Sequence, residues 1–132
     1  MTENELLTLA KGARGNSYAP YSGFAVGAAL LAADGRVFLG SNFENASYSL
    51  TLCAERAAFA AAITAGAREF AMLAVVGGKA GEDCVFCPPC GACLQVLCEF
   101  CPADFPIVLE REGEATVLHL SDLLPITFQL KE

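Results

Sequence analysis

The sequence has 132 residues, which is enough for one domain (1–132) to bury a core without added cross-links. Eight basic and fifteen acidic residues give a net charge of −7, which argues against a nucleic-acid-binding protein. The longest apolar run, FAVGAALLAA, has about ten residues and is too short to cross a bilayer, so we expect no contact with a membrane.

The predicted helices and strands alternate along the chain. In order they are a helix at 3–17, strands at 24–33 and 36–43, a helix at 51–65, a strand at 72–78, a helix at 90–100, and strands at 106–110 and 115–120. Asp34-Gly35 marks a tight turn, and the wholly apolar run MLAVVGG indicates a strand buried on both faces. This order predicts an α/β domain of three layers with a mixed sheet.

The cysteines indicate where the chemistry lies. The acidic, polar N-terminus is unlike a signal peptide, so we expect a cytoplasmic protein, in which thiols stay reduced. Six of the seven cysteines fall in one tract, CVFCPPCGACLQVLCEFC (84–101), and their CxxC spacings favour metal over disulfides. An iron–sulfur cluster is the first alternative, but the spacing after CxxCxxC does not fit one. It would also leave the segment Cys53-Ala54-Glu55 unexplained.

Cys53 and the pair Cys90 and Cys93 lie at the starts of two predicted helices, where the helix dipole favours thiolates. Three thiolates from two helix starts leave the fourth position of a zinc ion open, as in catalytic zinc sites. Glu55 lies two residues after Cys53, one of the predicted zinc ligands. A carboxylate there can take a proton from zinc-bound water and pass it to a substrate. The pattern x-E…P-C-x-x-C is the signature of zinc-dependent nucleobase deaminases.

The remaining cysteines are not needed for this zinc. Cys98 lies ~7.5 Å beyond Cys93 along a helix, at ~1.5 Å per residue, whereas two sulfurs on one zinc are about 4 Å apart. We therefore expect Cys98 and Cys101 to be small buried apolar side chains or surface thiols. Cys84 and Cys87 lie in a loop that chain geometry does not exclude, so a second metal or a redox pair remains an alternative there.

Along almost its whole length the sequence resembles the short, single-domain cytidine deaminases. The matching segments are YAPYSGFAVGAALL, NFENASYSLTLCAERAA, PCGACLQVLCEF and LLPITF. The resemblance implies a three-layer α/β/α fold with a mixed five-stranded sheet. It also implies hydrolysis of cytidine and deoxycytidine to uridine and deoxyuridine plus ammonia, in pyrimidine salvage. Cys53, Cys90 and Cys93 would bind one Zn²⁺ per subunit, and Glu55 would be the proton shuttle for a zinc-activated water.

The resemblance also implies a set of residues that bind the nucleoside substrate. Asn42 and Glu44 would hydrogen-bond the ribose hydroxyls, and their spacing puts both side chains on one face of a strand end. Phe24 would line the base and sugar pocket, and the backbone N–H of Ala54 would bind the pyrimidine carbonyl. Arg56 would offset the charge of three thiolates on one divalent ion.

The resemblance implies a homotetramer with sites at subunit interfaces, where Tyr48 and Phe128 would reach a neighbouring subunit's site. The high apolar content, 55% against 17% charged residues, also favours a face covered by another subunit. Two positions depart from the family pattern: Pro88 replaces a serine, and Leu94 replaces an arginine that would lie near the zinc.

Two other functions remain open. One is a deaminase of the same fold that acts on another aminopyrimidine, such as the nucleoside antibiotic blasticidin S. The other is a non-enzymatic zinc protein, in which Cys84 or Cys87 would complete a closed Cys₄ site.

Overall fold

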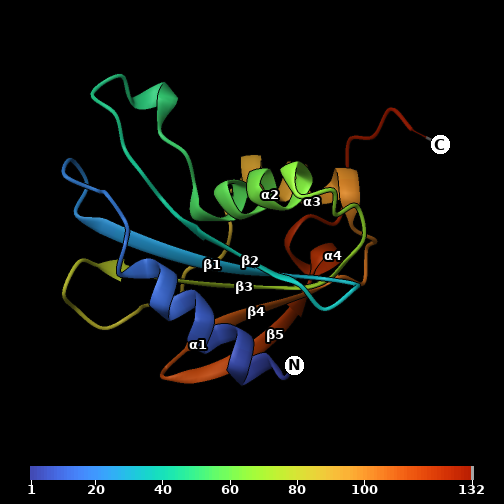
Figure 1. Cartoon of the computed structure of the whole chain (residues 1–132), viewed down its shortest axis with the longest axis horizontal. Coiled ribbons are helices and arrows are strands. Elements are labelled where there is room, and N and C mark those ends of the chain that lie inside the picture. Colours follow the sequence, from blue (N-terminus) through green and yellow to red (C-terminus); the bar gives the residue numbers. More distant parts are fainter. Residues whose placement is uncertain (132) are drawn as a thin grey trace.

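The computed structural model describes residues 1–131 as a mixed sheet with helices on both faces (Figure 1). Glu132, the last residue of the predicted domain, lies outside the described residues. In chain order the elements are α1 (Glu3–Arg14), β1 (Phe24–Ala32), β2 (Val37–Ser41), the 3-10 helix η1 (Tyr48–Leu50), α2 (Ala54–Thr64), β3 (Phe70–Lys79), α3 (Gly91–Phe100), β4 (Pro106–Arg111), β5 (Glu114–His119) and α4 (Leu120–Leu123).

Five strands form the sheet within the described residues, in the spatial order β2-β1-β3-β4-β5. Only β3 and β4 run parallel, with Leu73 opposite Ile107, and α3 makes the crossover between them. The pairs β1–β2, β1–β3 and β4–β5 are antiparallel. The predicted mixed five-stranded sheet is therefore confirmed.

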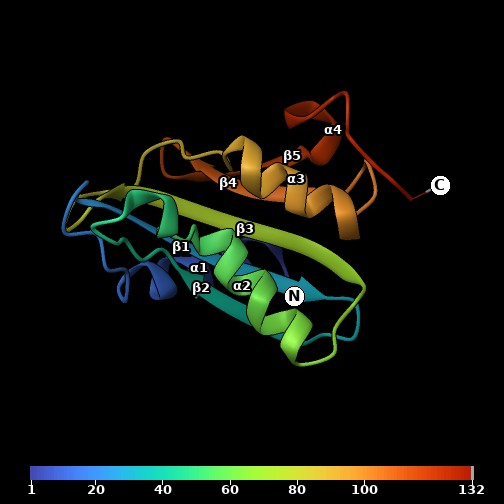
Figure 2. The ribbon, with the colours of Figure 1, turned by 90° about the horizontal axis from the view of Figure 1, so that it is seen from above.

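Helices cover the two faces of the sheet unequally. Figure 1 shows the sheet nearly edge-on, with α1 on one side and α2 and α3 on the other. Figure 2 shows α2 and α3 lying side by side over this face, in roughly the direction of β3. Alternate strand residues belong to two separate cores: Leu30, Leu73 and Ile107 face α2 and α3, whereas Ala29 and Val108 face α1. This confirms the three-layer α/β/α fold.

The first helix begins and ends where its side chains find partners. The Thr2 hydroxyl accepts from the backbone N–H of Glu5, whose carboxylate accepts from the N–H of Thr2. The helix ends at Arg14, three residues before the predicted end at residue 17. Arg14 donates to the carbonyls of Ala25 and Lys79, so the end of α1 is fixed to the ends of β1 and β3.

The second helix begins at Ala54, three residues later than the sequence pattern predicts. Leu52 and Phe43 form an isolated antiparallel bridge, and this pairing keeps Thr51–Cys53 extended. Cys53 consequently becomes the N-cap of α2. Gly40 of β2 allows close contact with this helix, because a Cβ there would lie 2.1 Å from the Ala54 carbonyl oxygen.

A hydrophobic side-chain cluster fills the space between the sheet and the helices α2 and α3. Phe59 of α2 stacks on Phe100 of α3 with ring centroids 5.8 Å apart, and Phe70 meets both rings edge-on. Cys98 and Cys101 are buried in the same core, which confirms the expectation that they are small apolar side chains. Within residues 1–131, every helix is too short or too polar to cross a bilayer.

Candidate metal centre and active site

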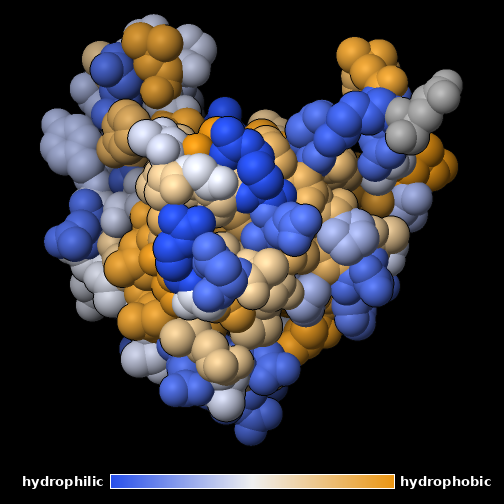
Figure 3. Space-filling view, turned by 45° about the vertical axis from the view of Figure 1, so that its right-hand side comes forward, coloured by the Kyte–Doolittle hydropathy of each residue, from blue (hydrophilic) through white to orange (hydrophobic). Residues whose placement is uncertain are grey.

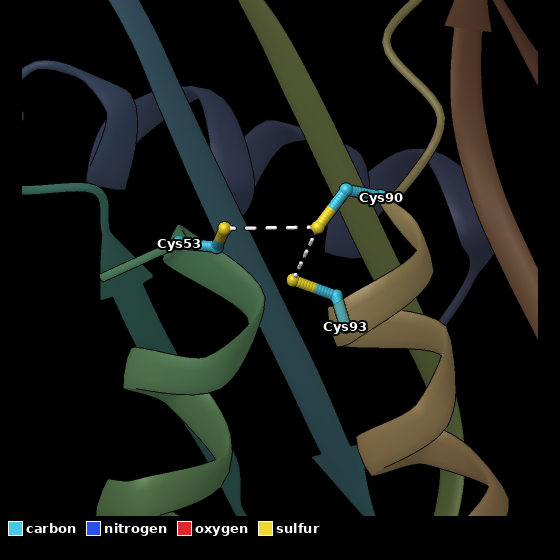
Figure 4. A group of neighbouring side chains, drawn as sticks. All are labelled: Cys53, Cys90 and Cys93. Atoms are coloured by element: carbon cyan, nitrogen blue, oxygen red, sulfur yellow. Dashed lines mark hydrogen bonds between the residues drawn. The ribbon is translucent and has the colours of Figure 1, made fainter. Parts of the chain in front are cut away.

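The three cysteines predicted as zinc ligands converge between the starts of α2 and α3 (Figure 4). Cys53 and Cys90 are the N-caps of these two helices, and Cys93 lies in the first turn of α3. The Sγ atoms of Cys53 and Cys90 are 3.9 Å apart, and those of Cys90 and Cys93 are 3.5 Å apart. All three sulfur atoms lie within 4.8 Å of one another.

This geometry fits a zinc ion. Two thiolates bound to one tetrahedral zinc, each at ~2.3 Å, lie about 4 Å apart, as these sulfurs do. Among the described residues no other cysteine, histidine or carboxylate joins the group. Cys84 and Cys87 therefore do not complete a closed Cys₄ site, and the three-thiol group leaves one position of a tetrahedral ion open.

The charge of the sulfur group is offset by Arg56. Its Nη2 atom donates to the Sγ of Cys53 at 3.5 Å. Hydrogen bonding from Cys93, followed by that from Arg56, lowers the pKa of Cys53 to about 5, although burial opposes the shift. Arg56 is half-buried and lies against the sulfur of Cys53, where the resemblance implies a cation.

Glu55 is buried beside the thiols, with 5% of its surface exposed. It lies in the first turn of α2, two residues after Cys53. Burial raises the pKa of the Glu55 carboxyl, and the negative charge of Cys53 adds to this shift. A carboxyl with a raised pKa next to a metal site is well suited to accept and return a proton near neutral pH.

A cavity of about 270 Å³ opens beside the metal centre. Six residues predicted to act in the site line it: Phe24, Asn42, Glu44, Tyr48, Ala54 and Glu55. Cys53 and Cys90 line it as well, so one cavity joins the three-thiol group to the predicted nucleoside pocket. The lining residues that were not predicted as site residues are Ser22, Val26, Thr51, Leu52, Cys87 and Pro88.

Asn42 is held in place by three hydrogen bonds within the protein. Its Oδ1 accepts from the backbone N–H of Val26 at 2.8 Å and from the Ser17 hydroxyl. Its Nδ2 donates to the Phe24 carbonyl at 2.9 Å. Because a side-chain amide has two acceptor and two donor positions, Asn42 keeps one N–H for a ligand.

Glu44 is fixed in a similar way by the turn that precedes β1. Its Oε1 accepts from the backbone N–H groups of Tyr21 and Ser22, and its Oε2 accepts from the Ser22 hydroxyl. The Ser22 hydroxyl bond is the main reason why the pKa of Glu44 lies below its ordinary value. A carboxylate with these partners keeps one acceptor position on Oε2.

A family model described as the cytidine and deoxycytidylate deaminase zinc-binding region matches residues 1–109. The chain belongs to this deaminase family. The resemblance that the sequence motifs indicate is therefore confirmed, and the zinc-binding region of the family agrees with the three-thiol group at the starts of α2 and α3.

Similar proteins match the deaminase chain over nearly its full length. A cytidine deaminase of Sporosarcina psychrophila is 44% identical, and the match covers 100% of this chain and 95% of the relative. The crystal structure of cytidine deaminase from Burkholderia pseudomallei is 48% identical with a TM-score of 0.88, covering 97% and 100% of the two chains. That from Mycobacterium tuberculosis is 41% identical with a TM-score of 0.82, covering 98% and 99%.

Phe128 is the one predicted substrate-binding residue that the deaminase fold places away from the cavity. It lies on the C-terminal tail with 67% of its surface exposed. Gln95 of α3 donates to its carbonyl at 2.9 Å, so the tail is attached to the helix that carries Cys93. Figure 3 shows the segment before α2 and the C-terminal tail as two projections with a hollow between them.

Proposed function

We propose that this protein is a single-domain zinc-dependent cytidine deaminase that hydrolyses the C4 amino group of cytidine and deoxycytidine in pyrimidine salvage. The observation that carries the proposal is the single cavity that joins the three thiols and Glu55 to Asn42 and Glu44. The end of the cavity near the thiols and Glu55 suits hydrolysis of a C–N bond. The end lined by Asn42 and Glu44 suits binding of a sugar.

One zinc ion per chain, bound by Cys53, Cys90 and Cys93, would supply the Lewis acidity that lowers the pKa of water toward about 7. Glu55 takes the first proton that the water loses and delivers it to N3 of the pyrimidine, the ring nitrogen next to C4, while the water oxygen bonds to C4. Glu55 then carries the remaining proton of this oxygen to the amino group, the bond between C4 and the amino nitrogen breaks, ammonia leaves and a carbonyl remains at C4. The burial that raises the pKa of Glu55 lets it both accept and donate.

The start of α2 also orients the base. The backbone N–H of Ala54 belongs to the first turn, where helix N–H groups have no partner within the helix, and it donates to the C2 carbonyl. Across the cavity, the Pro88 carbonyl accepts from the substrate's amino group, since proline retains this acceptor. The ring of Phe24 lines the space between these groups.

The free hydrogen-bonding positions of Asn42 and Glu44 match one sugar hydroxyl. Asn42 has one N–H to give and Glu44 has one acceptor position. A hydroxyl group accepts one bond and donates another, so a single hydroxyl satisfies both residues. Recognition through one hydroxyl is compatible with both ribose and deoxyribose. It also favours a nucleoside over an aminopyrimidine without a sugar hydroxyl.

We further propose a cytoplasmic homotetramer with active sites at the subunit interfaces. The segment before α2 exposes Tyr48 and Leu50, and the C-terminal tail exposes Ile126 and Phe128. These two segments flank the hollow in Figure 3. Exposed groups of this kind are typical of surfaces that a second subunit covers. Phe128 would then complete the pocket of a neighbouring subunit, and Tyr48, at the rim of its own chain's cavity, would reach across the same interface.

The test is an ultraviolet absorbance assay with cytidine on purified wild type, Glu55→Gln and the control Glu69→Gln, with zinc counted per chain. Glu69 is an exposed carboxylate between α2 and β3. We expect one zinc per chain in all three proteins and turnover only in wild type and Glu69→Gln. Turnover by Glu55→Gln at the wild-type rate would contradict the mechanism, and an inactive wild type would contradict the function.

A further inference from the structure

Cys87 is a lining residue of the cavity to which the proposed mechanism gives no role. It lies three residues before Cys90, in the loop between β3 and α3. The backbone N–H of Val85 donates to the carbonyl of Gly77 at 2.8 Å, which fixes this loop against the end of β3. The loop therefore has a defined position relative to the sheet.

Two adjacent glycines of β3 place Cys87 and Cys84 on opposite faces of the sheet. A Cβ added at Gly77 would lie 2.7 Å from the Sγ of Cys87, whereas one added at Gly78 would lie 3.1 Å from the Cα of Cys84. Successive strand residues point to opposite faces, so the two cysteines belong to different sides. Cys84 accordingly lines another cavity, of about 570 Å³, together with Lys11 and Arg14 of α1. This placement disfavours the alternative of a shared metal or a redox pair.

The Cys87 thiol packs beside the ring of Phe24. The same added Cβ at Gly77 would lie 3.0 Å from Cε2 of Phe24, so thiol and ring fill the space above this glycine. Burial raises the pKa of Cys87 to about 11, so the thiol stays neutral near pH 7. A neutral, half-buried thiol behaves as a small apolar group. Cys87 and Phe24 thus form an apolar wall of the cavity.

The proposed function fixes which edge of the pyrimidine meets this wall, and the present inference rests on it. Glu55 and Ala54 act on N3 and on the C2 carbonyl, so the N3 edge faces the start of α2. The opposite edge, C5 and C6, then faces the loop before α3. Along this loop Cys90 is at the metal, the Pro88 carbonyl is at the C4 amino group, and Cys87 comes next. C5 is the ring atom next to C4 on this edge.

We propose that Cys87 is a specificity-determining residue that contacts C5 of the pyrimidine and limits the size of the substituent accepted there. The thiol is backed by Gly77 and Phe24, so it has little room to move away from a larger substrate. The volume of the side chain at position 87 therefore sets the available space.

The test compares kcat/KM for 5-bromocytidine and for cytidine in wild type, Cys87→Ala and Cys87→Val. We expect the ratio of 5-bromocytidine to cytidine to rise about tenfold in Cys87→Ala and to fall about tenfold in Cys87→Val. Matched controls are Cys84→Ala and Cys84→Val, which change the loop on the other face and should leave the ratio within about twofold of wild type. The ratio of deoxycytidine to cytidine should not move in the Cys87 variants.

Binding of the products uridine and 5-bromouridine, measured by calorimetry, gives a second readout that needs no turnover. Suppose that wild type deaminates cytidine but the Cys87 variants change neither the kcat/KM ratio of 5-bromocytidine to cytidine nor the affinity ratio of 5-bromouridine to uridine. This inference is then wrong, while the proposed function stands. A shift of equal size in the Cys84 variants would also overturn it, because the effect would not be local. If wild type neither deaminates cytidine nor binds uridine, the proposed function fails and this inference fails with it.

Discussion

The guanidinium of Arg56 donates from Nη2 to the Sγ of Cys53 over 3.5 Å, one helical turn along α2 from the N-cap. The Nε of the same side chain is buried and has no hydrogen-bond partner among the described residues. Arg56 is therefore held beside the sulfur of Cys53, although within residues 1–131 its Nε makes no hydrogen bond in this position. Position 94, which the family pattern gives to a second cation, is a buried leucine in the core.

Replacing Arg56 by Gln should weaken zinc binding, because three thiolates on one divalent ion would lose the cation that offsets their charge. Partners of metal ligands typically contribute 10–100-fold in affinity, so we expect a loss of about that size. Competition with a chromogenic chelator measures it. Arg36→Gln is the control, since Arg36 is exposed and contacts Asp34 in the β1–β2 turn. Equal affinity in Arg56→Gln and wild type would contradict the role of Arg56.

Removing the cysteines outside the metal centre should not change the zinc content. We expect one zinc per chain when Cys84, Cys98 and Cys101 are all replaced by Ala, since none belongs to the group of three thiols. Losing the buried Cys98 and Cys101 side chains should lower the free energy of unfolding by about 1 kcal/mol each. Replacing Cys53, Cys90 or Cys93 by Ala should instead lower the zinc content, and unaltered zinc in those variants would contradict the assignment.

Ser22→Ala should make the free energy of unfolding lower at neutral pH and less dependent on pH in acid, through Glu44. The folded-state pKa of Glu44 lies below its ordinary value, chiefly because of the Ser22 hydroxyl bond. A lowered carboxyl pKa contributes stability that is present above the unfolded pKa and is lost as pH falls through the folded value. Ser22→Ala brings the two pKa values closer together, so it removes part of this contribution.

Urea unfolding of both proteins between about pH 3 and pH 7 measures the effect. Wild type should be more stable than Ser22→Ala by a constant amount down to about pH 4.5, and the difference should shrink at lower pH. Ser121→Ala, at an exposed serine of α4, should show no such trend. A difference that grows on acidification would have the wrong sign and would contradict the assignment to Glu44.

Gly40→Ala should displace the start of α2. The new Cβ would lie 2.1 Å from the carbonyl oxygen of Ala54 and 2.6 Å from the backbone nitrogen of Ala58, so the helix must move. We expect a loss of stability of about 1–3 kcal/mol together with weaker zinc binding, because Cys53 caps this helix. Thermal unfolding and zinc content measure the two effects.

Gly12→Ala provides the matched control for this substitution. Gly12 lies in α1 and has no atom within 4 Å of an added Cβ. Alanine is the better helix former, so the variant should gain up to about 1 kcal/mol and keep its zinc. If both variants lost zinc equally, the contact between β2 and α2 would not be what positions Cys53.

The sequence pattern predicts the metal centre better than its surroundings. The CxxC spacing and the helix start bring Cys90 and Cys93 together locally, whereas the approach of Cys53, 37 residues away from Cys90, is predicted only by the deaminase signature that joins the two segments. The beginning of α2 is predicted three residues early because the bridge between Leu52 and Phe43 is a tertiary contact. Helix propensity of the segment contains no information about that contact.

The partners of Asn42 and Glu44 could not be predicted in this way. Ser17, Tyr21 and Ser22 lie in an irregular segment that the sequence pattern marks only as the end of a helix. The positions of Cys84 and Cys87 on opposite faces likewise depend on how the loop pairs with Gly77. Both features come from the packing of distant segments, and α4 in the tail, which the pattern does not predict, packs against α3 and β5.

Asn42 and Glu44 hold fixed orientations through bonds to Ser17, Ser22 and the backbone of β1. A sugar that binds there meets a preorganised wall, so little rotamer entropy is lost on binding at that end of the cavity. Binding free energy from the sugar then remains available to hold C4 against the metal and Glu55, where the barrier to hydrolysis lies. Loosening the wall at Ser17, far from any reacting atom, would on this basis lower kcat as well as raise KM.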